Sequence, residues 1–259
     1  MSKPSQSDPL ATLSTILDQA ADQAMGFFNS LSERAVEAKA PGDLVSDADR
    51  KVEATLRRLL GQHFPDCGVL GEEYGGTPTG RFWAVDPIDG TSNFLSGLPF
   101  WTISLGLMQD DQPVIGGIIA PALGLAVVGH ADGVLQETGL TPNSRSADPP
   151  CVGIGRNPRW PALDRQKVEA AIEAAGFSPR LFGSCALSLM LVATGRLKGY
   201  IEPRVGGLWD CAGGLALCRA AGLPTAFHLH PDGTVDVLAG DVFAIVQAAG
   251  WKAEPDNTQ

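Results

Sequence analysis

Residues 83–94 read Trp-Ala-Val-Asp-Pro-Ile-Asp-Gly-Thr-Ser-Asn-Phe, and this stretch places two carboxylates at the end of an apolar strand. Asp86 closes the strand, Pro87 stiffens its exit, and Asp89 follows before a Gly-Thr pair that can begin a helix. The two carboxylates can therefore converge on one point. Hard divalent cations such as Mg²⁺ prefer carboxylate and carbonyl oxygens, and a pair of neighbouring ions needs a carboxylate that bridges them. The stretch predicts such a site, with Asp86 as the bridge.

The start of the expected helix adds a binding site for an anion. The backbone N–H groups of Gly90 and Thr91 would point at a phosphate held beside the cations. An isolated Asp-Pro-x-Asp-Gly pattern is more often a turn than a metal site, because both dipeptides are common turn material. The full stretch is far more specific than that pattern, which favours the metal site.

The stretch resembles the first signature of the inositol monophosphatase family, whose distant relatives include fructose-1,6-bisphosphatases and 3'-phosphoadenosine phosphatases. Upstream, Val-Leu-Gly-Glu-Glu at 69–73 is similar to the family's Gly-Glu-Glu element. The first Glu of that element is a metal ligand that helps to hold the attacking water, which implies this role for Glu72. Alone, a Glu pair is usually a solvated turn.

Two further segments extend the resemblance. Downstream, Leu-Trp-Asp-Cys-Ala-Gly-Gly at 208–214 resembles the second family signature, which implies that Asp210 binds the second metal, although Asp is also an ordinary helix N-cap. Residues 39–49 are similar to the family's mobile loop, in which a Lys and the last Asp lie near a weaker third metal. Lys39 is one residue closer to Asp43 than in the common pattern, so only Asp49 is carried over.

Substrate contacts follow from the same resemblance. Phe-Gly-Ser-Cys-Ala at 182–186 resembles a helix start that contacts substrate hydroxyls, with Cys185 where relatives commonly carry Ala or Thr. Glu202 resembles the acidic residue that binds the inositol ring, but it precedes Asp210 by eight positions, one more than usual. The substrate is therefore left open. The expected substrate-binding residues are Asp89, Gly90, Thr91, Gly183, Ser184, Cys185, Glu202 and Asp210.

The resemblance implies direct hydrolysis of a phosphate monoester by water, with two Mg²⁺ ions and a third left open. One ion would be held by Glu72, Asp86 and the carbonyl of Ile88, and the other by Asp86, Asp89 and Asp210, while Thr91 and Glu72 orient the water. Inhibition by lithium and a homodimer are implied as well.

Three functions stay open at this point. The first is an inositol monophosphate or related sugar phosphate monoesterase. The second changes only the substrate, to histidinol phosphate or a 3'-phosphonucleotide. The third is a binding or regulatory protein on the same fold, against which the complete set of Glu72, Asp86, Asp89, Thr91 and Asp210 argues.

Composition excludes other classes of protein. The 259 residues are 44% hydrophobic, enough for a sizeable core, and the net charge of −10 with scattered Lys and Arg argues against nucleic-acid binding. Five cysteines form no Cys-x-x-Cys pair, and neither a signal peptide nor a membrane-spanning run is found. We expect a cytoplasmic protein that binds a small phosphorylated metabolite, with no nucleic-acid or membrane partner.

The pattern of apolar residues predicts the fold. Three- and four-residue intervals predict a helix over 10–38, then a loop or short hairpin over 39–46 and a helix from Asp47 or Asp49 to Gly61. Short apolar runs between Gly68 and Gly139 predict strands, several of them close enough in sequence to pair as antiparallel hairpins, and α/β alternation follows the polar link at 141–150. A polar link at 141–150 suggests an α+β half at 1–140, with the main metal-binding motifs, and an α/β half at 141–259, with Asp210 and the selectivity residues. The resemblance implies a layered α-β-α-β-α sandwich.

Overall fold

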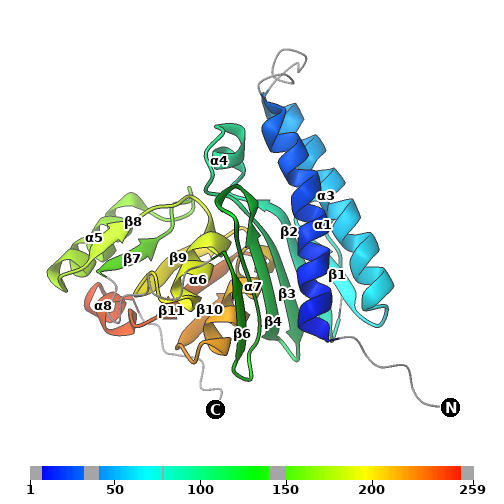
Figure 1. The fold of residues 1–259 in the computed structure, drawn as a ribbon. Helices are drawn as coiled ribbons and strands as arrows, with labels where there is room; N and C mark the ends of the chain where they lie inside the picture. The colour runs from blue at the N-terminus through cyan, green and yellow to red at the C-terminus, as the bar shows by residue number, and fades with distance from the viewer. Residues whose placement is uncertain (1–7, 32–40, 78, 140–149, 252–259) are drawn as a thin grey trace.

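Five layers make up the protein, with three layers of helices alternating with two sheets (Figure 1). The structure is a computed structural model that describes residues 8–31, 41–77, 79–139 and 150–251, and over 41–46 it describes the backbone alone. The layered α-β-α-β-α sandwich expected from the sequence is confirmed.

The first sheet takes its strands in chain order. They are β1 (Gly68–Gly71), β2 (Phe82–Asp89), β3 (Thr102–Gln109), β4 (Gln112–Ala120), β5 (Leu125–His130) and β6 (Val134–Thr138). The β1–β2 pair is parallel and all later neighbours are antiparallel, as expected for short strands joined by tight turns. A 3-10 turn, Pro121–Leu123, joins β4 to β5.

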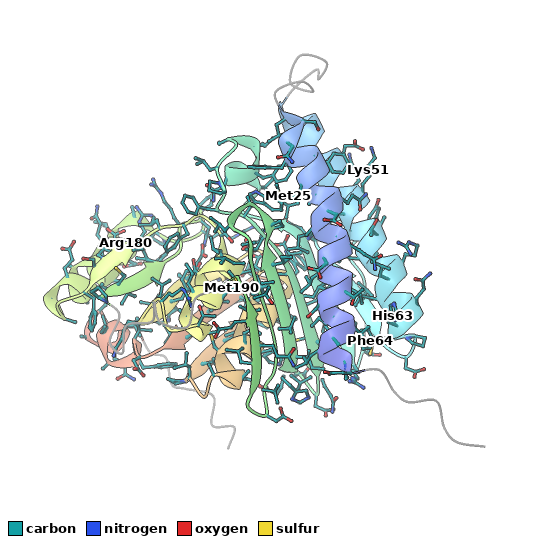
Figure 2. The ribbon with its side chains drawn as sticks, in the orientation of Figure 1. Met25, Lys51, His63, Phe64, Arg180 and Met190 are labelled. Carbon is teal, nitrogen blue, oxygen red and sulfur yellow. The ribbon has the colours of Figure 1, made fainter. Side chains whose placement is uncertain are left out.

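Two long helices cover one face of this sheet, α1 (Pro9–Asn29) and α3 (Pro41–His63). Their apolar residues recur at helical spacing and pack against alternate residues of β2, among them Trp83 and Val85, which are fully buried. Figure 2 shows Lys51 and His63 on the outer face of α3, where both side chains are exposed. The other β2 residues, Phe82 and Ala84, point to the opposite face.

The middle layer contains α6 (Cys185–Ala193) and α7 (Leu208–Ala220), with Met190 buried within it (Figure 2). Helix α7 approaches the first sheet backbone to backbone, because a Cβ on Gly106 or on Gly116 would overlap the backbone of Gly213. This close approach holds the helix that carries Asp210 against β3 and β4, in the same sheet as β2, which carries Asp86 and Asp89.

The second sheet has the order β10 (Thr225–Leu229), β11 (Val235–Gly240), β9 (Gly199–Val205), β7 (Cys151–Ile154) and β8 (Ser178–Arg180). Strand β7 runs parallel to β8 and β9, and the remaining pairs are antiparallel. Helices α5 (Ala162–Ala174) and α8 (Phe243–Ala248) cover its outer face, and α4 (Thr91–Leu95) follows β2.

Some boundaries differ from those expected. The loop expected before Asp47 is wrong from Pro41 onward, since α3 begins there; proline suits the first helical position because the N–H it lacks needs no partner at a helix start. Helix α1 ends at Asn29, where the Ser30 N–H bonds the Phe27 carbonyl. Lys39 and the 140–149 link, where the expected boundary between halves falls, lie outside the described residues.

Two further observations bear on the chemistry of the chain. All five cysteines lie in the described part of the chain and are free thiols. Within that part, no helix has the length and apolar character needed to cross a membrane.

Candidate metal centre and active site

The end of β2 brings two carboxylates to an irregular stretch of the sheet. Pairing between β2 and β3 shifts register between Asp86 and Asp89, and such a bulge re-aims the side chains on either side of it. Asp86 is buried, and its Oδ1 accepts a hydrogen bond from the Ile88 N–H at 2.9 Å. The irregularity therefore sits in the Asp-Pro-x-Asp segment singled out in the sequence.

Three other elements bring acidic side chains to Asp86. Glu72 directly follows β1, which runs parallel to β2, and its N–H donates to the Val85 carbonyl at 3.2 Å. Asp210 lies in the first turn of α7, and Asp49 lies on α3. After burial, the charges of Glu72, Asp89, Asp210 and Asp49, in that order, are the causes that raise the pKa of Asp86 well above its usual value. The structure thus brings together every acidic residue assigned to the metal site from the sequence.

Burial is the largest cause of a raised pKa for each of these carboxyls. It raises the pKa of Asp49 to about 8, Glu72 to about 7 and Asp89 to about 6, and the pKa of Asp210 well above its usual value. Charge repulsion within the cluster adds to the effect on Asp49, Glu72 and Asp210. By surface exposure, Asp49 and Asp86 are buried, Asp89 and Asp210 are half-buried, and Glu72 is exposed. Ionising the buried carboxylates of this cluster is costly unless cations offset their charge.

The donor set fits hard divalent cations. It consists of carboxylate oxygens, and the Oδ2 atom of Asp49 is buried without a hydrogen-bond partner in the described structure. Among the described residues, no three Asp, Glu, His or Cys side chains already stand in the arrangement of a metal site. The chemistry of the donors therefore carries the fit.

Asp89 links β2 to the start of α6. Its carboxylate accepts hydrogen bonds from the Ser184 hydroxyl at 2.5 Å and from the backbone N–H of Ala186 at 2.7 Å and Cys185 at 3.3 Å. Gly183 has φ +73°, which lets the chain turn into this helix start. The expected substrate residues Gly183, Ser184 and Cys185 thus lie beside an expected metal ligand.

The turn after β2 is ordered by Gly90, Thr91 and Asn93. Gly90 has φ +93° and precedes α4, and Thr91 Oγ1 donates to the Ile88 carbonyl at 3.0 Å. The carbonyl expected to bind a metal therefore already accepts one hydrogen bond and keeps a second lone pair. Asn93, which the sequence analysis does not single out, donates to the carbonyls of Phe100 and Phe182, each at 2.7 Å.

Glu202 is buried on β9 and held by two side chains that sequence reasoning misses. The Tyr200 hydroxyl donates to its Oε2, and Asn157 Nδ2 donates to its Oε1 at 2.9 Å. Burial is the main cause that raises the pKa of Glu202, and its charge adds to the raised pKa of Asp89. The Tyr-x-Glu spacing could have indicated Tyr200, because alternate strand residues share a face. Asn157 comes from another segment and leaves no such signal.

A cavity of about 500 Å³ lies elsewhere, between α5 and the chain after α8. Its lining includes Arg159, Trp160, Arg204 and Trp251, and none of the clustered carboxylates. Hydrolysis depends on the groups that contact the reacting atoms, so chemistry and not volume places the candidate site at the carboxylates.

Known proteins are similar to this chain over most of its length. A family model described as "Inositol monophosphatase family" matches residues 9–254. An uncharacterized protein, y4fL, from Sinorhizobium fredii is 44% identical over 83% of this chain and 78% of its own length. An inositol-1-monophosphatase from Mesorhizobium japonicum is 34% identical over 87% and 88%, and a histidinol-phosphatase from Mycobacterium tuberculosis is 32% identical over 83% and 85%.

A solved structure shares the fold. Inositol monophosphatase II from Staphylococcus aureus superposes with a TM-score of 0.71 at 26% identity, covering 92% of this chain and 93% of its own.

Proposed function

The chain belongs to the inositol monophosphatase family, and from that premise we propose that it hydrolyses a small phosphate monoester with Mg²⁺ as cofactor. The observation that carries the proposal is the convergence of Glu72, Asp89 and Asp210 on buried Asp86. A cluster of carboxylates around buried Asp86 suits catalysis that depends on divalent cations, and a purely structural role would leave its repulsion without compensation.

The proposed ligands are the groups expected from the sequence: Glu72, Asp86, the carbonyl of Ile88, Asp89 and Asp210, with Asp49 beside a third, weaker site. The chemistry that Mg²⁺ supplies when bound is the acidification of a water molecule and the neutralisation of charge on the phosphoryl oxygens. Asp86 would be shared between two ions, because the charges of Glu72, Asp89, Asp210 and Asp49 all raise its pKa.

Glu72 and Thr91 are proposed to orient and deprotonate the water. Burial is the main cause that raises the pKa of Glu72 in the metal-free chain, and cations beside it would hold it ionised, the form that can accept a proton from the water. Thr91 Oγ1 donates a hydrogen bond to the Ile88 carbonyl, so its lone pairs are left to accept a hydrogen bond from the water, whose proton passes to Glu72. The Thr91 hydroxyl would therefore donate to the Ile88 carbonyl and accept from the water.

Asp89 and Glu202 are proposed to select the substrate. Both carboxylates accept hydrogen bonds, and the charge of Glu202 affects the pKa of Asp89, so the two lie close enough to act on one small molecule. Acceptors of this kind match the hydroxyls of a polyol, which favours inositol monophosphate or a related sugar phosphate.

A second candidate substrate is histidinol phosphate. One observation favours it: the segment between Glu202 and Asp210, one residue longer than usual, contains Arg204 in the left-handed region, with φ +59°. This alters the segment beside Glu202, and a buried carboxylate can pair with the amine of histidinol as well as with a hydroxyl. A relative named histidinol-phosphatase is 32% identical to this chain, which supports the second candidate.

The test is a phosphate-release panel with purified full-length protein. Inositol 1-phosphate, histidinol phosphate and a 3'-phosphonucleotide are assayed with Mg²⁺ and with EDTA. We expect Mg²⁺-dependent release that is lost in Asp86→Asn and kept in the control Asp111→Asn, whose side chain is exposed. If the folded protein released no phosphate with Mg²⁺ from any of the three, the regulatory or binding function would be favoured.

A homodimer also remains a proposal. Light scattering coupled to gel filtration tests it directly, with a mass near 54 kDa, twice the 27.1 kDa of one chain, as the expected result.

A further inference from the structure

An ion pair on α3, between buried Glu53 and half-buried Arg57, contacts the turn that carries Glu72. Glu53 has no exposed surface, and its Oε1 accepts a hydrogen bond from Arg57 Nε at 2.7 Å, one helical turn later. Asp49 lies one turn earlier on the same face of the helix. Neither Glu53 nor Arg57 is among the site residues expected from the sequence.

Both oxygens of Glu53 are used by the turn. Oε2 accepts from the Glu73 N–H at 2.7 Å, and Oε1 accepts from the Tyr74 N–H at 3.4 Å. The carboxylate lies so close to Gly71 that a Cβ there would overlap it. Because peptide N–H groups and a guanidinium already occupy this carboxylate, Glu53 is poorly placed to act as another metal ligand.

Arg57 closes the turn from its other side. The Arg57 Nη2 atom donates to the Gly75 carbonyl at 2.5 Å, and its Nη1 atom donates to the Val69 carbonyl at 3.4 Å. The Gly71 N–H also donates to the Gly75 carbonyl, at 3.1 Å, so the two ends of residues 71–75 meet. One guanidinium therefore bridges the strand before Glu72 and the end of the turn after it.

Electrostatics alone gives no reason for Glu53 to be here. The charge of Glu53 is among the causes that raise the pKa of Glu72, so it adds repulsion to a cluster that is already acidic. The arrangement instead gives two backbone amides of the turn a partner and fixes the backbone on both sides of Glu72.

We infer that Glu53 and Arg57 are positioning residues that hold residues 71–75 in the shape that presents Glu72 to the metal centre. The inference rests on the proposed function, because it concerns the same metal centre. Its consequence is that cation affinity depends on a pair of residues whose side chains are directed to the turn and not to the cations.

Arg57→Met separates positioning from simple charge effects. Removing a positive charge near the cluster should tighten cation binding if only long-range electrostatics mattered, whereas releasing the turn should weaken it. Arg58→Met is the matched control, because Arg58 is the next residue of the same helix and its side chain is exposed. Mn²⁺ binding to metal-free, full-length protein is measured by electron paramagnetic resonance, without substrate.

We expect Arg57→Met to bind Mn²⁺ roughly tenfold to a hundredfold more weakly than the wild type, with Arg58→Met close to the wild type. Arg57→Lys, which keeps the charge but cannot bridge two carbonyls, should fall between them and serves if Arg57→Met does not fold. Amide exchange at Glu73 and Tyr74 should accelerate in both Arg57 variants.

Unchanged or tighter Mn²⁺ binding by the folded Arg57 variants would overturn the inference alone. If the wild type itself bound no Mn²⁺, the proposed function would be overturned together with it.

Discussion

The Ser184 hydroxyl donates a 2.5 Å hydrogen bond to the Asp89 carboxylate, which joins the last residue of β2 to the N-cap of α6. Ser184 Oγ also accepts from the Leu187 N–H at 3.1 Å, so one hydroxyl caps its own helix and holds a proposed metal ligand. Asp89 lies on a strand of the first sheet, and Ser184 lies at the start of a helix in the middle layer. The site therefore depends on how the middle helical layer packs against the first sheet.

Ser184→Ala should destabilise the protein by about 1 kcal/mol, the usual cost of a lost N-cap. Urea unfolding measures the change. Ser188→Ala is the control: Ser188 is buried in the same helix, but its hydroxyl bonds only the Ser184 carbonyl, at 2.7 Å, which also accepts from the Ser188 N–H. A cost for Ser184→Ala no larger than that for Ser188→Ala would contradict the capping role.

Asp86→Asn should lower Mg²⁺-dependent turnover by at least about a hundredfold, because the change removes charge from the proposed shared ligand. The same change should raise the melting temperature in EDTA by about 2 °C or more, since it removes a buried charge surrounded by like charges. Asn keeps the oxygen that accepts from the Ile88 N–H. Phosphate-release assays and calorimetry check the two effects, with Asp111→Asn as control.

Near-normal turnover in Asp86→Asn would show that Asp86 is not the shared ligand. A lower melting temperature in EDTA would show that its charge is compensated in the metal-free fold.

The stability of the metal-free protein should fall as pH rises. Asp49, Glu72 and Asp89 have pKa values raised to about 8, 7 and 6 from ordinary values of 3.8, 4.5 and 3.8. Between the ordinary and the raised pKa values, the folded chain binds more protons than the unfolded chain. The stability that these carboxyls contribute is therefore complete below the ordinary pKa values and is lost as the pH rises through the raised ones. Melting temperatures in EDTA should therefore decrease from about pH 5 to about pH 8.

Saturating Mg²⁺ should reduce this decrease, because cations stabilise the ionised carboxylates. The control is Asp111→Asn, whose profile should follow the wild type. A melting temperature in EDTA that rose over the same pH range would contradict the raised pKa values.

The parts of the site that the sequence predicts are those with a local signal. Asp86 and Asp89 stand at the end of an apolar strand and beside turn residues, so their spacing alone brings them together. Asp210 lies in the first turn of α7, and the residues that follow it, including Gly213, are small. They are small because α7 packs directly on the backbone of the strands.

The contacts that the sequence does not predict form only after distant segments pack. Asn157 reaches Glu202 across 45 positions of the chain, and Glu53 reaches the Glu73 amide across 20. Neither residue type nor spacing indicates such a pair in advance. The start of α3 was missed for another reason, because Pro41 ends one helix as readily as it begins another.

Lithium gives the final test of the second metal site. Li⁺ is close to Mg²⁺ in size but carries half the charge, so it could occupy the carboxylates of Asp86, Asp89 and Asp210 without supporting turnover. We expect lithium to reduce turnover at saturating substrate, because bound Li⁺ would hold phosphate in place after hydrolysis. Steady-state assays over a LiCl series, with KCl matching ionic strength, measure the effect.

The Asp210→Asn variant links lithium inhibition to this set of ligands. Its carboxylate accepts from the Gly207 N–H at 3.3 Å, a bond that the Asn side-chain oxygen can keep, so the change removes charge with little change of shape. Wherever residual turnover is measurable, inhibition should need more lithium than in the wild type, since one of three charges that attract Li⁺ is gone. Inhibition of the wild type by LiCl that matched KCl would mean that Asp86, Asp89 and Asp210 do not form the second site.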